Sequence, residues 1–208
     1  MSNGDNGNQR QSTTPEQVLR PSGGYENLKV YKLAMLIQDI TVHFVDLYIP
    51  PASRTCDQMV QAARSGKQNI IEGSIDAATS AKLELNLYNV ARGSLEELKA
   101  DYIDYLRQHG ERVWSKHDPL AEHFIHERIL TKQQFRQLIQ LAMQKSTSVI
   151  PRSIPLKSVL VANATILLIN VATFWLRQLI EEKTIGFLAE GGFSERLYRI
   201  RSQKRKSN

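Results

Sequence analysis

Hydrophobic and polar residues alternate with a helical period over the first half of the chain. Apolar side chains return every three or four residues, which places them on one face of a helix. No stretch of sequence alternates with a period of two for long enough to predict a strand. Three long helices are therefore predicted, at Tyr25–Tyr48, from about Thr55 to Gly73, and from about Ser80 to His109.

The second of these segments has small residues on its apolar face. Met59, Ala63, Gly66 and Ile70 follow one another at helical steps. Small side chains let a neighbouring helix come close, so this helix is predicted to be central and buried. Gly66 lowers helix propensity, and a packing reason for it is expected.

The pattern weakens between Gly110 and Pro155 and then resumes in a long apolar helix. Two short helices are predicted in the weak region, near Pro119–Ile129 and at Thr131–Lys145, followed by a last helix from Leu156 to about Leu188. The predicted fold class is all-α, most simply an antiparallel four-helix bundle over residues 25–188 with a helical insertion at about 110–154. Residues 1–24, which lack the apolar core of a signal peptide, are expected to form a disordered arm, and residues 189–208 a suffix with a basic tail.

The last helix carries no charge between Ser158 and Leu176, which is long enough to cross a membrane. Asn163 and Asn170 interrupt the run, and unpaired amides are costly in hydrocarbon. A helix buried on all sides, by its own bundle and by neighbouring subunits, is the interpretation that the sequence favours. Asn163, Asn170 and Arg177 lie seven residues apart, which predicts a seam that fixes register at an oligomer interface.

Charge is concentrated at the C-terminal end of the chain. Lys and Arg number 27 against 21 Asp and Glu, which gives a net charge of +6, and Glu195–Asn208 alone holds six basic residues and one acid. Such a tail can neutralise phosphates, and one aromatic ring within it can stack on an unpaired base. A solvated terminus is the alternative. The predicted nucleic-acid contacts are Arg196, Tyr198, Arg199, Arg201, Lys204, Arg205 and Lys206.

Polar residues also occur on the second and third predicted helices. Ser65, Asn69 and Glu72 lie at helical spacing and form one stripe on the second helix, and Arg92, Ser94 and Glu97 on the third helix are expected to join them. Because buried polar groups must be paired, the sequence favours an interhelical hydrogen-bond network over a functional site.

Catalytic signals are weak. The segment from His117 to Glu127 holds His117, Asp118, Glu122, His123, His126 and Glu127, yet their order matches no zinc or di-iron helix motif. A solvated connector is the favoured interpretation, and no metal or other cofactor is predicted. Cys56 is a single cysteine, which excludes an internal disulfide and suits the cytoplasm. No nucleophile has a visible base, so an enzyme is not expected.

Two segments resemble a known family. "SRTCDQMVQAARSGKQNIIEGS" and "VARGSLEELKADYIDYLR" are similar to bacterial four-helix-bundle proteins encoded by ribosomal-RNA intervening sequences and to accessory variability proteins of diversity-generating retroelements. The motif residues are Ala63, Arg64, Ser65, Asn69, Ile70, Glu72 and Gly73, then Ala91, Arg92, Gly93, Ser94, Leu95, Glu97 and Leu98.

The flanks "LRPSGGY" and "EGGFSERLYRIR" resemble those of a longer subfamily with a C-terminal suffix domain. The resemblance implies a non-enzymatic bundle that is a homopentamer in known relatives. Binding of nucleic acid and of a reverse transcriptase is attributed to the retroelement branch of the family. Two departures are "SIDAAT" after Gly73, where the family has a Gly-Arg turn, and the insertion.

The leading hypothesis is a non-catalytic oligomeric protein, outside membranes, that binds RNA or DNA through its basic tail and assists another protein. An oligomeric protein-protein scaffold without nucleic-acid affinity is the second hypothesis. A metal-dependent enzyme centred on His123, His126 and Glu127 is the third.

Overall fold

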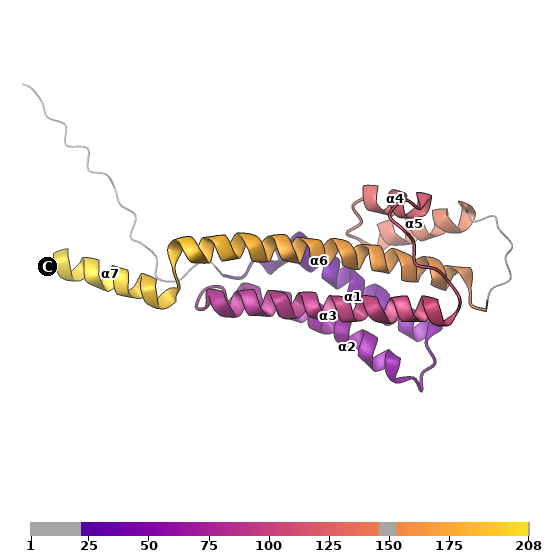
Figure 1. The fold of residues 1–208 in the computed structure, drawn as a ribbon, viewed down its shortest axis with the longest axis horizontal. Helices are drawn as coiled ribbons and strands as arrows, with labels where there is room; N and C mark the ends of the chain where they lie inside the picture. Colours follow the sequence, from indigo (N-terminus) through magenta and orange to yellow (C-terminus); the bar gives the residue numbers. More distant parts are fainter. Residues whose placement is uncertain (1–21, 146–152, 208) are drawn as a thin grey trace, which may run out of the picture.

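The structure, a computed structural model, describes residues 22–145 and 153–207, and none of these residues forms a strand. The all-α prediction is therefore confirmed. The elements in chain order are η1 (Tyr25–Asn27), α1 (Lys29–Tyr48), α2 (Arg54–Asp76), α3 (Ala81–Gln108), α4 (Pro119–His126), α5 (Lys132–Lys145), α6 (Leu156–Glu190) and α7 (Phe193–Ser207) (Figure 1).

Side-chain caps set where α2 and α3 begin. Ser53 accepts a hydrogen bond from the Thr55 backbone N–H at 3.2 Å, so α2 begins at Arg54, one residue before the predicted start. Ser80 accepts from the Leu83 N–H at 3.2 Å and caps α3 in the same way. Each hydroxyl satisfies a backbone donor that the first turn leaves free. The end of α2 lies beyond Gly73, at Asp76, so that part of the prediction is wrong.

α1, α2, α3 and α6 pack side by side, and we refer to them as the main body. α1 contacts α2 and α6, and α3 also contacts α2 and α6, which closes a ring around one core. Successive members of the ring run in opposite directions (Figure 1). The small-residue face of α2 lies in this core, since Met59, Ala63, Gly66 and Ile70 are all buried as predicted.

α2 and α3 approach each other closely at two glycines. A Cβ atom added to Gly66 would lie 2.8 Å from Leu95 Cδ2, and one added to Gly73 would lie 2.8 Å from Tyr88 Cε1. Both distances are far below van der Waals contact. The packing reason expected for Gly66 is therefore this contact with α3, and Gly73 has the same role two turns further along the same face of α2.

α4 and α5 cover the first half of α6. Both helices contact α6, and their apolar residues Phe124, Phe135 and Ile139 are buried with the core of the main body. The Phe124 ring lies 5.8 Å from Trp114 and 6.3 Å from Phe135, so the connector and both helices form one cluster on α6. Much of the uncharged surface of α6 is thus covered within the chain, without a neighbouring subunit.

The α6 segment is the candidate membrane span. Among the described residues, the helical run that starts at Leu156 is the one that is long and apolar enough to cross a membrane, and 72% of its most apolar window is buried within the chain. Burial of this kind is typical of a core helix and agrees with the expected burial by the helix's own bundle. Burial by neighbouring subunits stays a prediction.

The ends of the described chain meet the main body at the same end. The Gly23 N–H donates to the Ser74 carbonyl at 3.0 Å, and the Ser74 hydroxyl donates to the Gly23 carbonyl at 3.0 Å. This pairing fixes the chain at the C-terminal end of α2. Residues 1–21 of the predicted disordered arm and residues 146–152 of the predicted insertion lie outside the described residues.

Candidate nucleic-acid interface

The turn between α6 and α7 determines the direction of the basic helix. Gly191 has φ 75°, and its N–H donates to the Phe187 carbonyl at 2.9 Å. The Glu195 carboxylate accepts from the Gly192 N–H at 2.7 Å and closes the first turn of α7. A Cβ atom at Gly191 would meet this carboxylate, and the positive φ also disfavours any other residue there. α7 then extends beyond the end of the main body (Figure 1).

α7 has a polar face and a half-buried apolar face. Leu197 and Ile200 are partly buried, whereas the Tyr198 ring is 75% exposed. The cationic side chains of Arg199, Arg201, Lys204, Arg205 and Lys206 are exposed as well. At 100° per residue, Arg201, Arg205 and Tyr198 fall on one side of the helix. Most of the predicted contact residues are therefore accessible to a polyanion.

Arg196 is an exception to this pattern. Its side chain is 6% exposed, and Nη1 lies 3.4 Å from the Gly191 carbonyl, to which it donates a hydrogen bond. The prediction that Arg196 contacts phosphates is therefore wrong, because this guanidinium is buried at the α6–α7 turn.

A hollow lies between the end of α6 and α7. It has a volume of about 560 Å³, and Tyr198, Arg199 and Lys206 line it together with Leu188 and Glu195. Three of the predicted contact residues thus share one concave surface. A ring beside two cations can stack on a base while the cations neutralise its phosphates. Glu195 reduces the positive charge on one side.

The predicted polar network is smaller than expected. Ser65 Oγ and Ser94 Oγ are 3.0 Å apart across the α2–α3 contact, and Asn69 Nδ2 donates to Ser65 Oγ at 3.2 Å and to its carbonyl at 2.9 Å. This trio is the interhelical network that the sequence predicts.

The other three residues predicted to belong to the interhelical network do not join that trio. Glu72, Arg92 and Glu97 are exposed. Arg92 donates to Asn89 on its own helix at 3.4 Å, and among the described residues neither acid bonds to the trio. Their assignment to the interhelical network is wrong, because their side chains are exposed to solvent, although Glu97 lines the same surface hollow as Ser65 and Ser94.

Asn163 holds the connector against α6. It is 1% exposed, and its Oδ1 accepts from the Trp114 N–H at 2.7 Å. Its Nδ2 donates to the Val159 carbonyl at 3.1 Å and to the Arg112 carbonyl at 3.3 Å. The prediction that Asn163 lies at an oligomer interface is therefore wrong: its amide is fully paired within the chain.

The two other members of that predicted seam lie on the surface of α6. Asn170 and Arg177 are exposed, and Phe174 between them is 46% exposed. The Arg177 guanidinium carbon lies 5.8 Å from the centre of the Phe174 ring, within cation–π range. These three side chains make one exposed face around the middle of α6.

The His-containing segment forms a salt-bridged connector. Arg112 donates to both Asp118 oxygens, at 2.6 and 2.9 Å, and the Ser115 N–H donates to Asp118 at 2.6 Å. The Arg112 hydrogen bonds, aided by Ser115, lower the pKa of Asp118 to about 2. No group of three or more His, Cys, Asp or Glu side chains that could hold a metal occurs among the described residues.

A buried charged cluster at the α7 end of the main body is absent from the sequence interpretation. Glu84 is 1% exposed, and its Oε1 lies 3.0 Å from Lys183 Nζ. Tyr88 bonds to Glu84 and to Ser74, and burial followed by the Glu84 charge raises the pKa of Tyr88. The signal was available, because Glu84 precedes Tyr88 and Ala91 at helical steps on the apolar face of α3.

Comparisons with protein-family models, with curated proteins and with solved structures give no match. The family resemblance described above is therefore a hypothesis that rests on the quoted motifs alone.

Proposed function

We propose that the protein is a non-catalytic nucleic-acid-binding protein that holds RNA or DNA on α7. The observation that carries this proposal is the exposure of five cations and one tyrosine ring on a helix outside the main body. Phosphate neutralisation supplies affinity that does not depend on sequence, and Tyr198 supplies stacking. Acting as an accessory to a reverse transcriptase or another protein is the role that the family resemblance adds.

The proposal includes a four-helix bundle that assembles as a closed homo-oligomer, for which the resemblance suggests a pentamer. The ring of α1, α2, α3 and α6 supports the bundle. The face made by Asn170, Phe174 and Arg177 supports an interface, since an aromatic and an arginine are typical of interface centres. The expected location is the cytoplasm.

The decisive experiment is fluorescence anisotropy with labelled single- and double-stranded oligonucleotides between 50 and 200 mM salt. We expect a binding constant that falls steeply with salt. The variant Arg201→Gln/Arg205→Gln removes two exposed cations on one side of α7, so the logarithmic salt slope should decrease by about 2. The matched control is Arg64→Gln/Lys82→Gln, which removes two exposed cations from α2 and α3.

Tyr198→Ala tests the stacking part of the proposal. Loss of the Tyr198 ring should weaken single-strand binding by about tenfold. The effect on duplex should be smaller, because its bases are already stacked. A wild-type protein without affinity at 50 mM salt would contradict the proposal. So would a control variant that loses as much binding as the α7 variant, because net charge alone would then account for it.

A protein-protein scaffold is the second candidate, and one observation favours it. Ile185 and Leu188 are 69% and 77% exposed on the last turns of α6, where water contact is costly for large apolar side chains. Native mass spectrometry separates the two candidates: an oligomer with no bound nucleotide mass, together with no anisotropy change, would favour the scaffold. A monomer would contradict the oligomer in both.

A further inference from the structure

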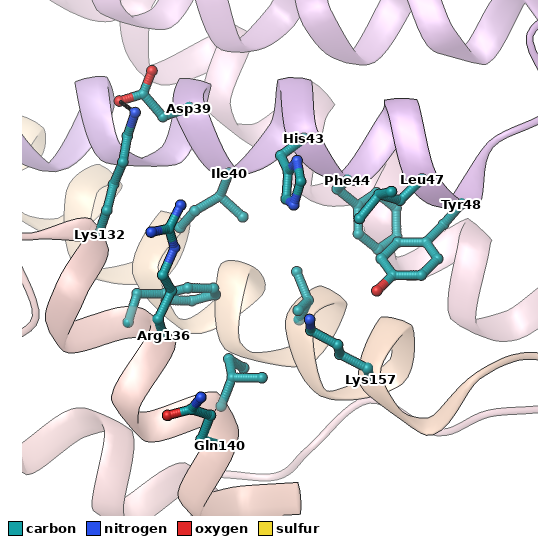
Figure 2. Close-up of a pocket in the computed structure, with 13 residues that line it drawn as sticks. Asp39, Ile40, His43, Phe44, Leu47, Tyr48, Lys132, Arg136, Gln140 and Lys157 are labelled. Atoms are coloured by element: carbon teal, nitrogen blue, oxygen red, sulfur yellow. Dashed lines mark ion pairs between the residues drawn. The ribbon is translucent and has the colours of Figure 1, made fainter.

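A cavity separates α1 from α5 at the end of the molecule opposite α7. Its volume is about 370 Å³, and α1, α5 and the start of α6 line it (Figure 2). This size lies at the lower end of the range of small-molecule sites, roughly 300–1,000 Å³. The cavity lies far from the basic helix and takes no part in the function proposed above.

Apolar side chains from all three helices line part of the cavity. Ile40, Phe44 and Leu47 come from α1, Phe135 and Ile139 from α5, and Val161 from α6. Phe44, Phe135 and Ile139 belong to the buried core, whereas Leu47 is 51% exposed. A ligand with an apolar body would gain burial at this wall.

Polar and cationic side chains line the rest of the cavity. Figure 2 shows His43 of α1, Arg136 of α5 and Lys157 of α6 reaching from three helices toward the same space. Lys132 is neutralised by Asp39, with Nζ 2.9 Å from Oδ2. In the part of the chain that the structure describes, Arg136 and Lys157 have no acidic partner. The three cations Lys132, Arg136 and Lys157 and the one acid, Asp39, leave two net positive charges at the cavity.

We propose that this cavity binds a small molecule with a carboxylate head and an apolar body. The carboxylate would lie between Arg136 and Lys157, because a guanidinium donates two hydrogen bonds to a carboxylate and an ammonium adds a third. The apolar body would lie against Phe44, Ile139 and Val161. The volume accommodates a ligand of about a dozen heavy atoms but not a folded segment of another protein.

The test is isothermal titration calorimetry of the full chain with sodium decanoate below its micelle concentration. Acetate provides the head alone, and decanol provides the body alone. We expect one decanoate per chain, bound at least about tenfold more tightly than either fragment, since both parts contribute. Arg136→Gln and Lys157→Gln should each weaken binding about fivefold, because both side chains are exposed and partly screened.

The control variant is Arg64→Gln, which removes an exposed guanidinium on α2 and should leave decanoate binding unchanged. Leu47→Asn removes apolar wall at an exposed position and should weaken decanoate without affecting acetate.

Four results would overturn the proposal: no heat of binding at millimolar decanoate, decanol as tight as decanoate, acetate or inorganic phosphate as tight as decanoate, or an equal loss in Arg64→Gln. Displacement of decanoate by an oligonucleotide would also overturn it, in favour of a second phosphate-binding region.

Discussion

The α2–α3 contact and the α1–α5 gap show two ways in which this chain joins its helices. At the first, Gly66 and Gly73 leave so little space that an added Cβ would overlap Leu95 or Tyr88. At the second, the long Lys132 side chain of α5 reaches Asp39 of α1 beside a cavity of about 370 Å³. Small residues bring backbones together and long ones keep them apart. We therefore expect the α2–α3 contact to stabilise the fold and the α1–α5 gap to bind ligands.

The polar groups at the α2–α3 contact are buried, whereas those at the α1–α5 gap are exposed. Glu84, at the end of the α2–α3 contact, is 1% exposed and depends on Lys183 and Tyr88 for its partners. Asp39 and Lys132, which bridge the α1–α5 gap, have side chains that are 39% and 57% exposed. Water can replace a lost partner at the gap but not at Glu84.

The largest effect is therefore expected from Lys183→Met. It leaves a buried carboxylate without its counter-ion, and the free energy of unfolding should fall by about 3 kcal/mol in urea denaturation. The double variant Glu84→Gln/Lys183→Met removes the unpaired charge and should recover about half of that loss. A loss below about 1 kcal/mol in the single variant would show that Glu84 finds water.

Gly73→Ala tests the close contact directly. The new methyl group would meet the Tyr88 ring at 2.8 Å and the Glu84 carbonyl at 3.3 Å. Overpacking costs about 1–3 kcal/mol, and the helix propensity gained offsets about 1 kcal/mol of this, so we expect a net loss of about 1 kcal/mol. Gly93→Ala is the control, because no atom lies within 4 Å of its added Cβ, and it should stabilise the protein by about 0.5–1 kcal/mol. Equal effects at the two glycines would contradict the close contact.

Lys132→Gln breaks the ion pair across the gap. Both side chains are substantially exposed, so the free energy of unfolding should change by about 0.5 kcal/mol or less. Thermal denaturation in low and high salt provides the check, since added salt should abolish even this difference. A decrease in the free energy of unfolding as large as that of Lys183→Met would contradict the distinction between the α2–α3 contact and the α1–α5 gap.

Asp118 shows that hydrogen bonds can lower the pKa of a carboxyl whose side chain is only 15% exposed. Its pKa, about 2, lies below the ordinary 3.8 because Arg112 and Ser115 bond to the ionised form. The carboxylate therefore stabilises the fold above about pH 4, and this contribution is lost as the pH falls through about 2. A carbon-detected NMR titration should place the Asp118 midpoint near 2, and Arg112→Gln should return it toward 3.8. An unperturbed wild-type midpoint would contradict the bidentate pair.

The helices and the α2 core face follow from periodicity, because a helix depends on neighbours three and four residues away. Partners of single polar groups do not. The Asn163 amide bonds to the backbone of Arg112 and Trp114, about fifty residues earlier. A polar residue in an apolar run suits an interface or an internal anchor equally well, and periodicity cannot choose between them. The prediction that Arg196 contacts phosphates rests on the charge of the tail alone, and this charge does not indicate that one side of α7 is buried.

The length of α6 has an electrostatic consequence. Its 35 residues at 1.5 Å per residue place Lys157, at its start, about 50 Å from the first turn of α7. Counter-ions screen charges beyond about 8 Å at physiological ionic strength. The cationic cavity at the start of α6 and the cationic helix α7 are therefore electrostatically independent. An anion bound at either one leaves the potential at the other unchanged, and only a movement of α6 itself could link them.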